Sequence, residues 1–327
     1  MRRLRNIVLV VGGLLILLAI VGACYQELAS RADARRFPEP GRLVDVGGFR
    51  LKLNCTGAGS PTVVLESGLG DVSVEWQAVQ SGVAKFTRVC SYDRAGYGGS
   101  DAGPMPRTSQ QIAGELHALL KNAGEKPPFI LVGHSFGGYN VRVFNGRFPD
   151  EVAGMVLVDT VQEDQYKLLP PVWNRVGSDL RAHYRSQARW APVRVNLGIE
   201  RARLQARGKA ENSYLYLQSK YLAARSDEIE HVQISAEQAR AAGTLGDKPL
   251  VVLTAGKKPA AGTLGLTEQD WDEYQRVWAD ELQLRLARLS SRGKREVVEG
   301  SGHNIPSERP DAIVNAVRET QMQISSR

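Results

Sequence analysis

Apolar residues recur along this chain with two periods, which predict alternating strands and helices. Short apolar or alternating runs between glycines, prolines and polar residues predict β-strands at 42–46, 49–55, 61–66, 87–92, 129–132, 154–159, 249–254 and 296–299. Longer segments with apolar residues three and four positions apart predict helices at 74–86, 108–122, 136–147, 267–290 and 309–321. Strands that alternate with helices pair in parallel through right-handed crossovers. The pattern therefore predicts an α/β fold with a mostly parallel sheet.

One long segment departs from this alternation. Residues 160–246 have a helical, basic and aromatic pattern without a run that predicts a strand. Because the segment lies between two predicted strands, we interpret it as an insertion into a single domain that covers 42–327. We expect it to form a helical cap over the strand ends that carry the loops.

The N-terminus is first basic and then wholly apolar. Arg2, Arg3 and Arg5 precede residues 7–24, a stretch of 18 residues without a charged side chain. This length approaches the roughly 20 residues that span a bilayer as a helix, and it exceeds the apolar core of a cleaved signal, which has about 7–15 residues. We expect an uncleaved membrane anchor within 1–26, with its basic end in the cytoplasm.

A second interpretation of the same stretch stays open. The sequence Val-Gly-Ala-Cys that ends at Cys24 resembles a bacterial lipoprotein cleavage box, in which Cys24 would carry the lipid. Either interpretation tethers the folded domain outside the cytoplasm. Residues 27–41 are then expected to form a short polar linker, stiffened at its end by Pro38 and Pro40.

The charge of the chain is unevenly distributed. The formal net charge is +7, and eleven Lys and Arg accompany only three Asp and Glu between positions 172 and 225. Such a patch suits an anionic membrane surface or acidic substrates, although solvated helix faces give the same pattern. No nucleic-acid-binding motif accompanies it, so we expect no nucleic-acid partner. The three cysteines lack metal-ligand spacing, so we expect no metal.

A Gly-x-Ser-x-Gly motif spans residues 133–137, between the apolar strand 129–132 and the predicted helix 136–147. A strand, this tight turn and a helix form a nucleophile elbow, which exposes the serine hydroxyl above the end of the sheet. The helix N-terminus adds donors and a favourable dipole. Ser135 is therefore the candidate nucleophile, and a turn that merely packs closely is the alternative.

A serine nucleophile needs a base, and the base needs an acid that fixes its tautomer. In the chain order of this elbow the serine comes first, then the acid and then the histidine. His303 lies in a glycine-rich loop after the last strand and is the candidate base. We interpret His134 as structural and expect the other histidines to be at the surface or solvated: His117, His183 and His231.

The acid is less clearly indicated than the base. Asp159 directly ends a predicted strand and is the candidate, with Asp164 and Asp270 as rivals. A carboxylate at a strand end also occurs simply as a turn residue.

Two backbone amides are candidates for an oxyanion hole, which stabilises the developing negative charge of an attacked carbonyl. One is the N–H of Phe136, which follows Ser135. The other is the N–H of Leu69 in the turn after the third strand, where Gly68 and Gly70 allow close approach.

Five segments together resemble the α/β-hydrolase superfamily, and most closely its bacterial membrane-associated members. They are Val-Val-Leu-Glu-Ser-Gly-Leu-Gly, Tyr-Asp-Arg-Ala-Gly-Tyr-Gly-Gly-Ser, Val-Gly-His-Ser-Phe-Gly-Gly, Val-Leu-Val-Asp and Gly-Ser-Gly-His, at 63–70, 92–100, 132–138, 156–159 and 300–303. The resemblance covers roughly 41–321. Two features depart from it: Glu66-Ser67-Gly68 stands where many relatives have His-Gly, and the acid is not where many relatives keep it.

The resemblance implies an eight-stranded sheet in the order 1-2-4-3-5-6-7-8, with helices on both faces. That order makes the strands of Cys55 and Cys90 neighbours, so the two are expected to form a disulfide outside the cytoplasm, with two buried thiols as the alternative. Epoxide hydrolases and haloalkane dehalogenases of this fold have an aspartate at the elbow, and Ser135 argues against both.

The resemblance and the residues together predict a membrane-tethered serine hydrolase that cleaves carboxylic esters and needs no cofactor. An acyltransferase, lyase or perhydrolase would use the same residues, and a non-catalytic binding protein would keep only the fold. The substrate is expected to be a small, apolar ester, and the oligomeric state stays open. Aromatic residues of the cap support an apolar substrate, although core packing explains some of them equally well: Trp173, Tyr184, Trp190, Tyr214, Tyr216 and Tyr221.

Overall fold

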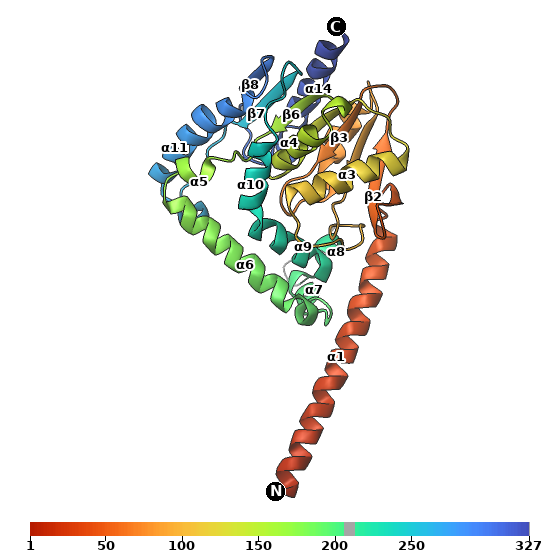
Figure 1. The fold of residues 1–327 in the computed structure, drawn as a ribbon. Coiled ribbons are helices and arrows are strands. Elements are labelled where there is room, and N and C mark those ends of the chain that lie inside the picture. Colours follow the sequence, from red (N-terminus) through yellow and green to blue (C-terminus); the bar gives the residue numbers. More distant parts are fainter. Residues whose placement is uncertain (206–212, 327) are drawn as a thin grey trace.

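A computed structural model describes residues 1–205 and 213–326 (Figure 1). The described residues form one eight-stranded sheet in the order β1-β2-β4-β3-β5-β6-β7-β8. Strands β1 and β2 pair antiparallel with their neighbours, and all pairs from β4 to β8 are parallel. The predicted fold class and strand order are confirmed. The strands are Arg42–Asp45, Arg50–Thr56, Thr62–Glu66, Val89–Tyr92, Phe129–His134, Val152–Val158, Leu250–Ala255 and Gly293–Val298.

Helices cover both faces of the sheet and bury its central strands. On one face, α3 (Ser109–Ala123), α4 (Gly137–Arg147) and α10 (Val232–Ala241) enclose the larger apolar cluster. On the other face, α2 (Gln77–Val83) and α14 (Pro310–Ser325) enclose the second cluster. Strands β3, β5 and β7 are buried along their whole length, which explains their continuous apolar sequences.

Local sequence explains the ends of one predicted helix, whereas another predicted helix is interrupted. Helix α3 begins after the Thr108 cap and ends at the left-handed Gly124, within one residue of the predicted bounds 108–122. The predicted helix 267–290 is instead interrupted. It consists of α11 (Glu268–Val277), a wide π turn η4 (Trp278–Leu282) and α12 (Gln283–Ala287). The short elements complete the fold: η1 (Ser73–Trp76), η2 (Pro149–Glu151), η3 (Thr263–Gly265) and α13 (Ile305–Glu308).

The inserted segment is helical in the residues that the structure describes. It contains α5 (Gln165–Leu168), α6 (Val172–Arg194), α7 (Ile199–Gln205), α8 (Ser213–Tyr216) and α9 (Ser219–Glu230). Helix α10 belongs to the same stretch of sequence but packs its apolar face against the sheet-covering helices α3 and α4. The portion that stands away from the sheet therefore ends near Glu230 rather than at residue 246.

A single long helix, α1 (Arg2–Arg36), extends from the body (Figure 1). It contains an apolar window of 18 residues that is long enough to cross a membrane and is not buried in the protein. The prediction of a polar linker at 27–41 is wrong for its first ten positions, because the helix continues to Arg36. Alanine, glutamate, leucine and arginine are frequent there and favour helix, and Pro38 follows where the helix has ended.

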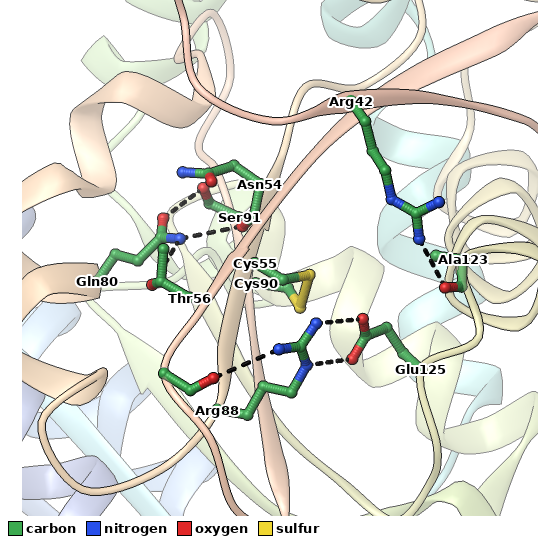
Figure 2. Close-up of a disulfide and its surroundings, with 11 residues drawn as sticks. Arg42, Asn54, Cys55, Thr56, Gln80, Arg88, Cys90, Ser91, Ala123 and Glu125 are labelled. Carbon is green, nitrogen blue, oxygen red and sulfur yellow. Dashed lines mark hydrogen bonds and ion pairs between the residues drawn. A yellow bond between two sulfur atoms is a disulfide. The ribbon is translucent and has the colours of Figure 1, made fainter.

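Strands β2 and β4 are joined by a disulfide between Cys55 and Cys90, as the family resemblance implied (Figure 2). Beside it, the Arg88 guanidinium donates to both carboxylate oxygens of Glu125, at 2.7 and 2.8 Å. Glu125 and the two cysteines are a geometric group of three potential metal ligands, but both sulfur atoms are already bonded to each other. The third cysteine, Cys24, is exposed on α1.

Candidate active site

Ser135 lies in the tight turn between β5 and α4, with a backbone φ of +50°. This conformation is strained for a residue with a side chain and is typical of a nucleophile elbow. Glycine is required on both sides. A Cβ at Gly133 would lie 2.8 Å from the Gly137 carbonyl oxygen, and one at Gly137 would lie 2.7 Å from the Glu66 carbonyl oxygen. The two glycines therefore let α4 begin directly against the sheet.

The three candidate catalytic side chains predicted from the sequence are hydrogen-bonded in series. The Ser135 hydroxyl oxygen lies 3.0 Å from Nε2 of His303, and Nδ1 of His303 lies 2.6 Å from Oδ2 of Asp159. The three residues come from the elbow, the loop after β8 and the end of β6. Because an ionised carboxylate only accepts hydrogen bonds, Nδ1 carries the proton and Nε2 is left free to accept one. The predicted serine, histidine and aspartate are thus brought together.

Asp159 is fixed by its surroundings as well as by His303. Its side chain is buried, and Oδ1 accepts hydrogen bonds from the Ala255 backbone N–H at 3.0 Å and the Trp278 indole N–H at 2.9 Å. The indole reaches this oxygen from the π turn η4 that interrupts the predicted helix. Nothing in the local sequence around Asp159 indicated this partner.

The two rival carboxylates have other partners and do not reach His303. Asp164 accepts from Arg240 at 2.8 Å and Arg285 at 3.1 Å. Asp270 forms the capping box at the start of α11, where it accepts from Thr267. Both side chains therefore stabilise local structure.

The aspartate and histidine shift each other's ionisation. Burial alone would raise the pKa of Asp159, but the hydrogen bond and charge of His303, together with the Ala255 and Trp278 N–H groups, hold that pKa below its usual range. Partial burial of His303 opposes its charged form, yet the hydrogen bond and charge of Asp159 outweigh this effect and raise the pKa of His303.

Two backbone N–H groups near Ser135 have no hydrogen-bond partner among the described residues. They belong to Phe136, at the start of α4, and to Leu69, in the turn after β3. This turn closely approaches the elbow, because a Cβ at Gly68 would lie 3.3 Å from the Cβ of Ser135. These are the two amides that we predicted from the sequence as donors of an oxyanion hole.

A buried arginine orients the turn that contains Leu69. Arg94 donates to the carbonyl oxygen of Ser67 at 2.7 Å and to that of Gly68 at 2.8 Å. In a trans peptide the C=O and the following N–H point in opposite directions. The hydrogen bond to the Gly68 carbonyl therefore turns the N–H of Leu69 away from Arg94.

Arg94 also links the sheet to the cap. Its guanidinium pairs with Glu66 at the end of β3 and with both oxygens of Glu228 on α9, at 2.9 to 3.0 Å. All three side chains are at most 2% exposed. Burial raises the pKa of Glu66, although the charge of Arg94 opposes this shift. The sequence reasoning included Arg94 only as part of a motif and missed both glutamates as its partners.

His134 is structural in its contacts, as predicted, although it lies next to the site. Its ring is buried, and Nε2 lies 3.0 Å from the backbone carbonyl oxygen of His303. Its Nδ1 lies 3.4 Å from a carboxylate oxygen of Asp71. Elsewhere, His183 is exposed, His231 pairs with Asp227, and the half-buried His117 stacks on Phe148.

Most of the aromatic cap residues have structural contacts. Trp173 packs against Trp271 and Tyr274. The Tyr214 hydroxyl donates a hydrogen bond to the Phe37 carbonyl oxygen, and the Tyr216 hydroxyl donates one to the Glu75 carboxylate. Trp190 is 52% exposed. Among these aromatic residues, Tyr221 reaches the candidate site, since its hydroxyl donates to the Gly70 carbonyl at 2.9 Å. Core packing thus explains several of these residues.

Comparison with known proteins adds a family and a fold. Residues 63–316 match the model of the alpha/beta hydrolase family. The chain is 26% identical over 310 residues to a "Probable transporter efuK" from Hormonema carpetanum, covering 84% of this chain and 42% of that protein. It is 27% identical over 284 residues to an "AB hydrolase superfamily protein" from Gibberella zeae, covering 79% of this chain and 85% of that protein. The chain thus spans less than half the length of the first relative.

Solved structures of hydrolases share the fold at low sequence identity. A thermophilic esterase from Thermogutta terrifontis is 20% identical with a TM-score of 0.62, covering 88% of this chain and 99% of the esterase. The enol-lactonase from Burkholderia xenovorans is 19% identical with a TM-score of 0.59, covering 86% and 100%. At these identities the similarity concerns the fold alone.

Proposed function

The chain belongs to the α/β-hydrolase family, and from this premise we propose that it is a serine hydrolase that cleaves carboxylic esters through an acyl-enzyme. The observation that carries the proposal is the unbroken line of hydrogen bonds from Ser135 through His303 to Asp159. This arrangement has the geometry of a nucleophile, a base and an orienting acid.

In the first half of the reaction, Ser135 Oγ attacks the ester carbonyl carbon and gives its proton to Nε2 of His303. The negative charge that develops on the carbonyl oxygen is stabilised by the backbone N–H groups of Phe136 and Leu69. The His303 imidazolium, stabilised by Asp159, then protonates the leaving alkoxide, and the alcohol departs. The acyl group remains on Ser135.

In the second half, His303 takes a proton from water, and the resulting oxygen nucleophile attacks the acyl-enzyme. The tetrahedral intermediate collapses when the Ser135 oxygen leaves and regains its proton from His303. The products are a carboxylic acid and the free enzyme. Besides the ester and water, this scheme uses side chains and backbone groups of the chain.

We further propose that α1 anchors the enzyme in a membrane and that the hydrolase domain lies outside the cytoplasm. The apolar window of α1 and the three arginines before it support this arrangement. The expected substrates are small, apolar esters, which partition toward a membrane surface.

The direct test uses the full-length protein in detergent. Wild type should hydrolyse p-nitrophenyl esters and react covalently with a fluorophosphonate probe, and Ser135→Ala should lose both properties. Ser291→Ala, which removes an exposed hydroxyl at another loop, should retain both. Equal turnover by Ser135→Ala and wild type would refute the serine as nucleophile. If Ser135→Ala is inactive, screening an ester library with wild type identifies the acyl chain that the enzyme prefers.

A further inference from the structure

The cap contacts the anchor helix through α8 and through the corner between α6 and α7. We define the α6–α7 corner as residues 190–203, which join the two helices. Its turn is pressed against α1, because a Cβ at Gly22 would collide with the Leu197 carbonyl oxygen, and one at Gly198 would lie 3.0 Å from the Tyr25 ring. The corner therefore has a defined position along α1.

A buried arginine fixes this contact. Arg201 on α7 is 3% exposed and donates to the Gln26 side chain at 2.9 Å and to the Ser30 hydroxyl at 3.0 Å. It also forms an ion pair with Asp33. These partners lie on one face of α1, so the body is held against the helix over about two turns.

The contact lies at the end of the apolar stretch of α1. Gly22 precedes Cys24, the last residue of the apolar stretch 7–24, by two positions, or about 3 Å along the helix axis. A helix that spans a bilayer places the ends of its apolar stretch at the lipid–water interface. The corner that touches Gly22 is therefore expected at the level of that interface.

The corner exposes the side chains that an interface favours. Trp190, Val193 and Ile199 are 52%, 45% and 49% exposed, and Trp190 and Val193 are three positions apart on α6. Arg189 and Arg203 beside them are also exposed. Tryptophan is enriched where lipid meets water, and exposed arginines attract anionic headgroups.

From this juxtaposition we propose that the α6–α7 corner is a second membrane-contact surface, seated in the lipid–water interface beside α1. Figure 1 shows the end of α6 and α7 beside α1, at the end of the body opposite the C-terminus. The proposal rests on α1 being a membrane anchor. Lipid is the expected partner of this surface because the corner lies directly against the apolar end of α1.

Tryptophan fluorescence tests this proposal in the full-length protein reconstituted into vesicles of phosphatidylcholine and phosphatidylglycerol. Lipids brominated in their acyl chains quench only tryptophans that contact them. Trp76, Trp271 and Trp278 are buried, which leaves Trp190 as the well-exposed member of the five tryptophans. In wild type, brominated lipid should remove about as much of the emission as the substitution Trp190→Phe removes in unbrominated lipid. The Trp190→Phe variant should show almost no further quenching by brominated lipid.

A matched control places a tryptophan on the opposite end of the body. Met322 is 60% exposed on α14, so Met322→Trp added to Trp190→Phe should restore emission that brominated lipid does not quench. Quenching equal to that of wild type in this double variant would overturn the proposal.

Other outcomes distinguish the anchor from the corner. Vesicle flotation with no quenching of Trp190 would overturn the corner as a lipid contact while leaving the anchor intact. A Trp190 shielded from both brominated lipid and aqueous acrylamide would assign the corner to a protein partner, such as a second copy, and would also overturn the proposal. Failure of the protein to float with vesicles would overturn the anchor and the corner together, whereas ester hydrolysis would be unaffected.

Discussion

At the scale of single residues, the position of Asp159 depends on groups that are distant in sequence. Its carboxylate accepts from a strand-end amide at Ala255 and from the indole of Trp278, in addition to His303. These donors fix one carboxylate oxygen and leave the other for the histidine. An acid held in this way orients the imidazole and stabilises its charged form.

Replacing the acid should therefore have a far larger effect than replacing its rival. We expect Asp159→Asn to lower kcat by about 10⁴-fold, because an amide at this position favours the wrong histidine tautomer. Asp270→Asn removes only a helix capping interaction and should leave kcat within a few-fold of wild type. Steady-state hydrolysis of a p-nitrophenyl ester measures both, and similar losses in the two variants would contradict the assignment.

The pH dependence of the reaction follows from the raised pKa of His303. The base works only when neutral, so activity falls as the pH drops through this pKa. Asp159 raises it, and the acid limb of kcat/KM in wild type should lie above about 6.5, the usual pKa of histidine. In Asp159→Asn the residual activity should have its acid limb at lower pH. An unchanged limb would show that another group controls it.

Arg94 is expected to act as a positioning residue for the oxyanion donor at Leu69. Lysine keeps the positive charge but cannot bond two carbonyl oxygens and a carboxylate in one plane. We expect Arg94→Lys to lower kcat by roughly tenfold to a hundredfold, less than the loss of an oxyanion donor, with little change in KM. Arg88→Lys, at the pair with Glu125, is the matched control and should retain kcat. A rise in KM alone would argue against positioning.

The sequence predicted part of this site because part of it is local. Ser135 and Phe136 lie in one short motif, and His303 stands alone in the expected loop. The acid was ambiguous because its selection depends on Trp278, which reaches Asp159 only through the π turn in a helix predicted to be regular. Glu228 was missed because it meets Arg94 across 134 positions of sequence.

At the scale of elements, the strand order brought Cys55 and Cys90 opposite each other on β2 and β4. Apolar runs and turn residues were sufficient to predict the strands, and the family resemblance supplied their order. The continuation of α1 beyond the apolar stretch was missed because its polar residues were interpreted by composition rather than by helix propensity.

Reducing the disulfide should destabilise the sheet where β2 pairs with β4. The two cysteines are 35 positions apart, and a crosslink of this kind contributes about 2–4 kcal/mol to the free energy of unfolding. Denaturant unfolding with and without reductant, in a Cys24→Ser background, should show a loss of that size. The Cys55→Ala, Cys90→Ala double variant serves as the control and should not respond to reductant. Identical unfolding of the oxidised and reduced parent protein would contradict the prediction.

At the scale of the whole molecule, the proposed anchor helix α1 and the body are joined by more than a flexible connection. Helix α1 continues past the apolar stretch and meets α7 through Arg201. Because the body is held on the helix, the orientation of the helix in a membrane would also determine the orientation of the hydrolase domain.

The fate of the N-terminus has a direct readout. An uncleaved anchor predicts that protein purified from membranes resists alkaline carbonate extraction and has an intact mass near 35.8 kDa. A lipoprotein would instead begin at Cys24, with a correspondingly smaller polypeptide mass plus lipid, and Cys24→Ser would abolish that processing. Full-length wild type that is washed off membranes by carbonate would contradict both forms of attachment.

The pairing of Arg94 with Glu228 also restricts how substrate range can be engineered in this scaffold. Exchanging caps between relatives is a natural way to change specificity, because a cap is a continuous insertion. In this chain, a donor segment without a carboxylate at the position of Glu228 would break a buried ion pair. Arg94 would keep Glu66 as a counter-charge, but its buried Nε–H would lose its acceptor, which is destabilising. A chimera should therefore retain α9 and exchange only the helices before it. Arg94 then keeps its partner Glu228 and continues to hold the turn that contains Leu69.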